Sequence, residues 1–251
     1  MRRAAALGVG SAAVLLAGGV AGCTTTAEQS AKVAAEGSHL IRARANLRIA
    51  KDNPAVRVRR AAVIATSAGT AAAVELRAAR RTRAEADLPL LIDVRDAAGR
   101  SVYRNDAAGL QPSLQRVGLV RPGRSTWWVS DQVAATGTPK RIAVRVGTGR
   151  AVATAPRVGL SKVHFARDAG GRYLTGIVRN HAGAPLREVP IFAVALRGRR
   201  IVAAGRALVP KLPARPGPKP VRFRLYFVGP TAGARVELSV APSLPVKEKT
   251  P

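Results

Sequence analysis

Few side chains in this sequence could carry out chemistry, and they are widely separated. The chain holds one cysteine and three histidines among 251 residues. A single cysteine can form neither an internal disulfide nor a cysteine-ligated zinc site. The histidines, His39, His164 and His181, lack the spacing that would place two of them on one helix face as metal ligands. We therefore predict neither a metal nor another cofactor.

Sequence motifs of catalysis are also missing. No Gly-x-Ser-x-Gly precedes a helical pattern, and no glycine-rich phosphate loop ends in Lys-Ser or Lys-Thr. Asp87 and Asp93 could share a strand face and act as an acid–base pair, although balancing nearby arginines is the simpler role. We predict that the protein is not an enzyme. The alternative is an enzyme that uses Asp93, His164 or His181.

Two adjacent tryptophans, Trp127 and Trp128, stand out because aromatic residues make up only 4% of the chain. Successive side chains of a strand point to opposite faces, so one ring would enter the core and the other would face outward. The outward ring could stack on a sugar or on an arginine. A core tryptophan beside a strand-edge tryptophan is the alternative. The pair is a candidate ligand-stacking site.

Arginine dominates the charge of the chain. Lysine and arginine number 42, of which 34 are arginine, against 14 acidic residues, and the formal net charge is +28. Several arginines alternate with other residues, which would align them on one face of a strand. These candidate polyanion contacts are Arg57, Arg59, Arg141, Arg145, Arg222 and Arg224. Such stripes favour phosphate-bearing polyanions. A soluble face that reflects an arginine-rich genome is the alternative.

The only cysteine stands at the end of an apolar amino-terminal segment. Two arginines precede an uncharged run of 19 residues, from 4 to 22, which is the form of a secretory signal. The run ends Val20-Ala21-Gly22-Cys23. This ending resembles the lipobox of bacterial lipoproteins, in which an aliphatic residue and two small residues precede the lipidated cysteine. The alternatives are a plain secretory signal and an uncleaved anchor, since the run could just span a bilayer.

The lipobox resemblance implies that a lipid on Cys23 holds the mature chain at the outer face of the cytoplasmic membrane. Several acyl chains give stable anchoring, since each buried methylene contributes about 0.8 kcal/mol. Removal of the two signal arginines lowers the formal charge from +28 to +26. The predicted partners are the membrane, envelope proteins and anionic envelope polymers, and nucleic acid is not among them. The arginine bias is typical of a high-GC genome, so we expect an actinobacterial source.

From about residue 41 onward, apolar and polar residues alternate in short runs, as in half-buried antiparallel strands. Clear examples are 90–94 and 142–146. Glycine and proline turn signals separate the runs, which favours a β-sandwich. Residues 71–83 could form a helix, because alanine and arginine favour one. The period of two at Val74 and Leu76 favours a strand instead, and we expect an all-β fold.

The two halves of this β region resemble each other. Residues 88–94 align with 189–195 at an offset of 101 residues, and Leu76 falls on Ile177 at the same offset. A repeat of about 100 residues has the size of an Ig-like sandwich. We predict two tandem Ig-like antiparallel β-sandwich modules after a signal peptide and a flexible tether. The predicted ranges are 1–22 for the signal peptide, 23–40 for the tether, 41–150 and 157–242 for the modules, and 243–251 for a polar tail.

The second module resembles the FxLYD-type Ig-like domains of bacterial envelope proteins over residues 158–242. The motifs are Gly-Ile-Val-Arg-Asn at 176–180, the strand 186–191, and Pro-Gly at 216–217 before Val-Arg-Phe at 221–223. An Arg-Gly-Arg turn at 197–199 replaces the Asp-Gly type of turn in that family. The resemblance implies an extracytoplasmic module without a catalytic set. We expect a binding or scaffold module at the cell envelope, with polyanion binding and an envelope enzyme as alternatives.

Overall fold

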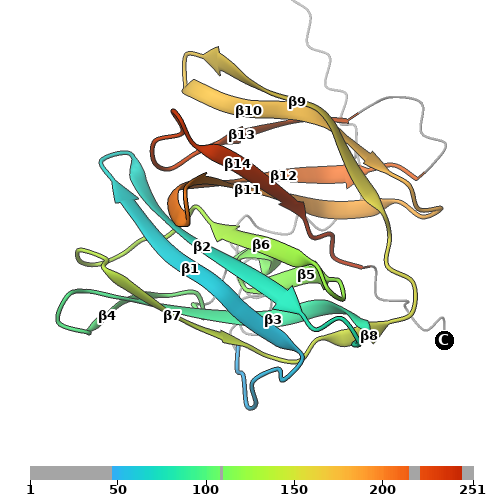
Figure 1. The fold of residues 1–251 in the computed structure, drawn as a ribbon, viewed down its shortest axis with the longest axis horizontal. Helices are drawn as coiled ribbons and strands as arrows, with labels where there is room; N and C mark the ends of the chain where they lie inside the picture. Colours follow the sequence, from blue (N-terminus) through green and yellow to red (C-terminus); the bar gives the residue numbers. More distant parts are fainter. Residues whose placement is uncertain (1–46, 108–109, 215–220, 245–251) are drawn as a thin grey trace, which may run out of the picture. The chain divides into compact units, whose positions relative to one another are not determined.

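The computed structural model of the protein describes residues 47–107, 110–214 and 221–244 (Figure 1). The predicted signal peptide, the tether and Cys23 lie outside the described residues. Contacts group these described residues into one compact unit. Within the described ranges, fourteen strands and one short 3-10 turn form sheets with antiparallel pairing between the strands. This confirms the predicted all-β antiparallel fold.

The first half of the unit contributes eight strands. Their bounds are β1 Val56–Thr66, β2 Gly69–Ala78, β3 Ala84–Arg95, β4 Ser101–Arg104, β5 Arg116–Val120, β6 Ser125–Ser130, β7 Arg141–Val146 and β8 Arg150–Val152, with the 3-10 turn at Pro112–Leu114. In one sheet, β2 lies between β1 and β6. In the other, β3 pairs with β5 and β8 through its first residues and with β4 and β7 through its last.

The second half repeats this pairing with six strands. They are β9 Val158–Asp168, β10 Gly171–Asn180, β11 Leu186–Arg197, β12 Arg200–Leu212, β13 Val221–Tyr226 and β14 Arg235–Val240. Here β10 lies between β9 and β13, and β11 lies between β12 and β14. Leu76 of β2 and Val178 of β10 both belong to a buried core, whereas Ile177 does not join that core. The offset between these two strands is therefore 102, one more than the sequence alignment indicates.

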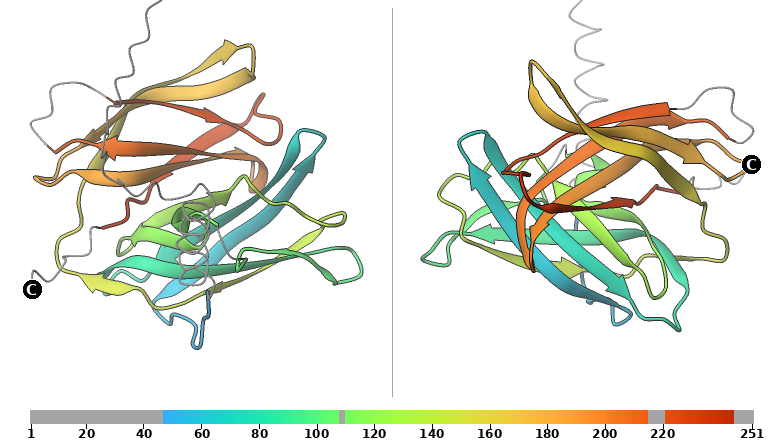
Figure 2. Two further views of the ribbon diagram at one scale, coloured as in Figure 1. Left: turned by 180° about the vertical axis from the view of Figure 1, so that it is seen from behind. Right: turned by 45° about the horizontal axis from the view of Figure 1, so that its top comes forward.

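The sheets stack in four layers (Figures 1 and 2). The β1–β2–β6 sheet packs against the β3 sheet on one side and against the β11–β12–β14 sheet on the other. The latter sheet also packs against β9–β10–β13. Phe192 and Val194 of β11 belong to the first core, whereas Ile191 and Ala193 belong to the second. A strand buried on both faces explains the continuous apolar run at 189–196.

Polar contacts also join the two halves. The Trp127 indole donates a hydrogen bond to Glu237 at 2.9 Å, and the Trp127 backbone N–H donates to Ser239 Oγ at 2.8 Å. The Arg206 side chain, only 5% exposed, pairs with Asp131 at 3.1 Å. The halves thus share both a core and hydrogen bonds. Their description as separate Ig-like modules stays a prediction. The predicted boundary between residues 150 and 157 also stays a prediction, and this stretch contains β8 and the segment that leads to β9.

Candidate functional site

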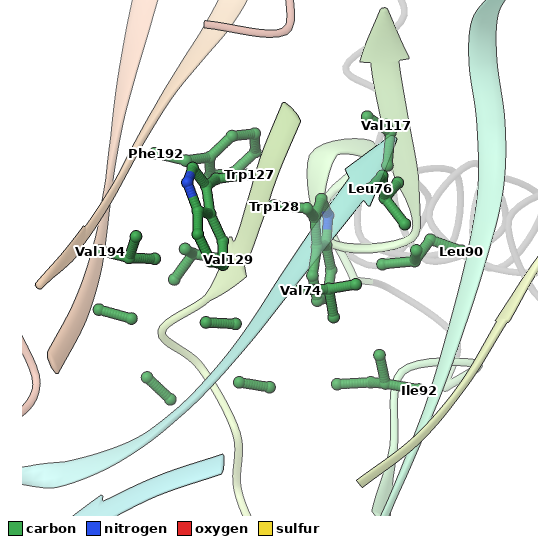
Figure 3. Close-up of a cluster of buried hydrophobic side chains, with 14 of the residues drawn as sticks. Val74, Leu76, Leu90, Ile92, Val117, Trp127, Trp128, Val129, Phe192 and Val194 are labelled. Carbon is green, nitrogen blue, oxygen red and sulfur yellow. The ribbon is translucent and has the colours of Figure 1, made fainter. Parts of the chain in front are cut away.

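Neither ring of the Trp127–Trp128 pair faces solvent. Trp127 is 2% exposed and Trp128 is fully buried, so the prediction of a ring that stacks on a sugar ligand is wrong. Both faces of β6 are covered: Trp128 lies on the side of Leu90, whereas Trp127 lies beside Phe192 of β11 (Figure 3). Stacking on an arginine does occur, inside the protein, because the Arg60 guanidinium lies 4.9 Å from the centre of the Trp127 ring.

Arg57 and Arg59 are both exposed, but they do not form the predicted stripe. The register of β1 against β2 shifts at this point, between Val58 and Arg60. Arg57 and Arg60 pair with β2 residues that are two positions apart. Arg57 therefore shares its strand face with Arg60, and the extra residue of the bulge is Arg59.

Arg141 and Arg145 share an exposed face, as their spacing predicts. They alternate along β7 with residues that are half-buried toward the first core. We call this surface the β7 face and define it by Arg95, Arg104, Arg141 and Arg145. Its ion pairs are Arg95–Asp93, Arg104–Asp106 and Arg145–Asp52, with N–O distances of 2.7, 2.6 and 3.0 Å. Carboxylates thus neutralise most of the charge of the β7 face.

Arg222 and Arg224 share an exposed face on the outermost sheet. Phe223 and Leu225 are buried in the second core, so the residues that alternate with them along β13 point away from it. We call this surface the β13 face and define it by His164, Tyr173, Thr175, Arg179, Arg222, Arg224 and Tyr226. Arg222 makes no ion pair with any described residue, and Arg224 reaches a carboxylate only at 3.4 Å. The charge of the β13 face is therefore largely uncompensated.

A shallow hollow of about 530 Å³ lies on the β13 face. Strand pairing forms it, because Thr175 of β10 lies opposite both His164 of β9 and Arg224 of β13. The Thr175 hydroxyl donates a hydrogen bond to the Phe223 carbonyl at 2.7 Å, which fixes its side chain. The lining includes arginine, histidine, threonine and tyrosine side chains but no carboxylate. This composition suits an anionic group.

Asp168 orders the edge of the β13 face. Its Oδ2 accepts a hydrogen bond from the Tyr226 hydroxyl at 2.6 Å and lies 3.4 Å from the Arg224 guanidinium. That guanidinium lies 5.2 Å from the centre of the Tyr173 ring. The hydrogen bond to Asp168 raises the pKa of Tyr226 above its usual value. The phenol therefore stays protonated at neutral pH and remains a donor.

The acids and histidines considered for catalysis lie apart. His164 lines the hollow of the β13 face, whereas Asp87 and Asp93 lie on β3. Burial raises the pKa of Asp87 above its usual value, and this effect outweighs the opposite effect of the positive charge of Arg150. Burial also acts on Asp93, but hydrogen bonds from Ser101 and a neighbouring arginine outweigh it and lower the pKa. In the part of the chain that the structure describes, no three histidine, cysteine or acidic side chains gather as metal ligands.

The sequence alone does not point to Tyr173, Thr175 or Asp168. The period of two along β10 places Tyr173 and Thr175 on one face, and that signal is readable in the sequence. A single sequence does not predict which strands pair with β10. The pairing of β10 with β9 and β13 is what brings these residues to Arg224.

No protein-family model and no curated protein matches the chain. The resemblances to lipoproteins and to FxLYD-type domains therefore stay predictions from the sequence. Among the described residues, no helix has the length and apolar character needed to cross a membrane.

Proposed function

We propose that the protein is a lipid-anchored binding or scaffold module that acts on the outer face of the cytoplasmic membrane without catalysis. The observation behind this proposal is that the only cysteine of the chain ends an apolar segment of lipobox form. Among Val20-Ala21-Gly22-Cys23, the thiol is the one nucleophilic side chain that could take a diacylglycerol. The exposed sheet faces of the described residues support a binding role.

Substitution of Cys23 tests the anchor. The wild-type chain should be found in the membrane fraction, with a mature amino terminus at residue 23 that has gained the mass of its acyl chains. Cys23→Ala should leave an unprocessed precursor without added lipid, because alanine has no nucleophile. Mass spectrometry of the amino-terminal peptide measures both. Identical processing and mass gain in the variant would refute the lipid anchor.

Polyanion binding is a second candidate function, and the uncompensated arginines of the β13 face favour it. Arg222 and Arg224 each present a planar fork of donors that suits phosphate oxygens. Binding through two such contacts predicts that the logarithm of the affinity falls with the logarithm of salt, with a slope of about −1 to −2. Titration of the full chain with a labelled phosphate polymer over a salt series measures the slope. Binding that does not respond to salt would contradict this candidate.

A further inference from the structure

The two arginine-bearing faces differ in how much charge is left to attract a ligand. On the β7 face, three of the four arginines have a carboxylate oxygen within 3.0 Å. On the β13 face, Arg179 and Arg222 have no ion-pair partner among the described residues, and Arg224 has one distant partner. Guanidinium groups without a carboxylate partner create the stronger positive potential. An anion should therefore prefer the β13 face.

The internal repeat shows what this face corresponds to in the first half. β2 pairs with β6 as β10 pairs with β13, so Arg222 and Arg224 occupy the positions of Trp127 and Val129. In the first half, those positions are apolar and buried in the core shared with β11. In the second half, the same sheet face is basic, and Arg222 and Arg224 are exposed. In the first half, this sheet face packs against another sheet. In the second half, the corresponding face is exposed and can bind a polar ligand.

Arg222 and Arg224 project from the same exposed face of β13. Side chains two residues apart on a strand are separated by about 7 Å along it. The Tyr173 ring centre lies 5.2 Å from the guanidinium of Arg224, and Asp168 lies 3.4 Å from it. The hydroxyl of Thr175 and the ring of His164 line the same hollow. The pair can therefore bind two anionic groups of one chain, each through a charge-assisted hydrogen bond.

Asp168 and Tyr226 indicate that the ligand has hydroxyl groups as well as anionic groups. An ionised carboxylate only accepts hydrogen bonds, so it repels a purely anionic partner but binds a hydroxyl donor. With about four acceptor sites, the Asp168 carboxylate can take a further donor beyond Tyr226, Arg224 and its own loop. Tyr226 is 42% exposed, and its ring offers an apolar surface to the C–H groups of a sugar or polyol.

We propose that the β13 face binds an anionic chain whose units have hydroxyl groups, such as a polyol-phosphate or sugar-phosphate polymer. Arg222 and Arg224 bind its anionic oxygens, Asp168 accepts its hydroxyl hydrogens, and Tyr226 contacts its carbon skeleton. The inference rests on the polyanion-binding role proposed above, and it assigns that role to a face and a ligand class. A membrane surface fits less well, because insertion into lipid needs several exposed apolar side chains. Among the described residues that define the β13 face, Tyr226 is the one exposed large apolar side chain.

The first test removes charge from one face at a time. The full chain in nonionic detergent is titrated with labelled poly(glycerol phosphate), and fluorescence anisotropy gives the affinity. Arg222→Gln with Arg224→Gln should weaken binding about tenfold or more, because two charge-assisted contacts are lost. The matched control, Arg141→Gln with Arg145→Gln, removes the same charge from the β7 face and should change the affinity less than about twofold.

The second test uses Asp168→Asn, which removes a negative charge and keeps one acceptor oxygen. If Asp168 binds a ligand hydroxyl, the variant should weaken binding of poly(glycerol phosphate) severalfold. The same variant should strengthen binding of inorganic polyphosphate, which has no carbon-bound hydroxyl and is only repelled by the carboxylate. Stronger binding of both polymers would overturn the hydroxyl part of the proposal.

The outcomes separate this inference from the function on which it rests. If both double arginine variants lose the same affinity, general basicity binds the polymer, so the assignment to the β13 face fails while polyanion binding stands. If the wild-type chain binds no phosphate polymer, polyanion binding itself fails. Phosphatidylglycerol added to the detergent micelles tests whether a lipid head group competes for the same face. If it displaces poly(glycerol phosphate) as well as the unlabelled polymer does, a lipid head group replaces the proposed chain as the ligand.

Discussion

Glu75 shows how a single buried acid binds Arg60, which together with Trp127 approaches Glu237 of the second half. It is buried on β2 and accepts a hydrogen bond from Arg60 at 2.6 Å, and Arg60 in turn stacks on Trp127. Burial raises the pKa of Glu75, but hydrogen bonds from Arg60 and Ser125 outweigh it and hold the pKa below the usual value. A pKa that is lower in the folded state means that Glu75 stabilises the protein above its unfolded pKa. That stabilisation is lost as the pH falls through the folded pKa.

Glu75→Gln should therefore lower the free energy of unfolding by about 1–3 kcal/mol at about pH 7. The difference from wild type should shrink at about pH 3, where the carboxyl of the unfolded chain is protonated. Urea unfolding at the two pH values measures it. Asp52→Asn is the control, because its pair with Arg145 is exposed and should contribute less than about 0.5 kcal/mol. An equal loss at both pH values would argue against a contribution from the charge of Glu75.

Among the elements, β3 depends on a side chain to complete its hydrogen bonding. β3 pairs with β5 through Glu85–Pro89 and with β4 through Asp93–Arg95. Between these two stretches, the fully buried Asn105 accepts the N–H of Ile92 at 2.7 Å. Its amide donates to the carbonyls of Leu90 and Leu114 at 2.8 and 2.7 Å. Three buried backbone groups thus rely on one amide.

Asn105→Ala should destabilise the fold by about 3 kcal/mol or more, since it leaves these buried groups without partners. Asn105→Asp should also destabilise, because a carboxylate cannot donate to the two carbonyls. Chemical denaturation with a linear extrapolation gives the free energies. Gln132→Ala, at an exposed position, should change stability by less than about 0.5 kcal/mol. A near-neutral Asn105→Ala would show that water replaces the amide.

The sequence predicts these elements better than their surroundings. The period of two identifies the strands at 90–94 and 142–146, because one face of each is more buried than the other. It also correctly favours a strand over a helix at 71–78, although residues 71–76 are buried on both faces. It fails for Trp127, because a sheet from the distant second half covers that face of β6. The period also places Arg222 and Arg224 on one exposed face, but it cannot bring Asp168 to them, since strand pairing is non-local.

For the whole molecule, the shared core predicts that the two halves unfold together. Both tryptophans lie in the first half, but Trp127 also contacts Phe192 and Glu237 of the second half. The measurement therefore uses a Trp127→Phe background, in which the emission of Trp128 reports on the first half alone. Leu225 lies fully buried in the second core, and Leu225→Ala should cost about 2–5 kcal/mol there. If the halves are coupled through β11, this substitution lowers the midpoint of the tryptophan transition as much as the calorimetric midpoint.

The control is Gly183→Ala, where an added Cβ meets no atom within 4 Å, and it should leave both midpoints unchanged. A tryptophan transition that does not respond to Leu225→Ala would mean that the halves unfold as independent modules.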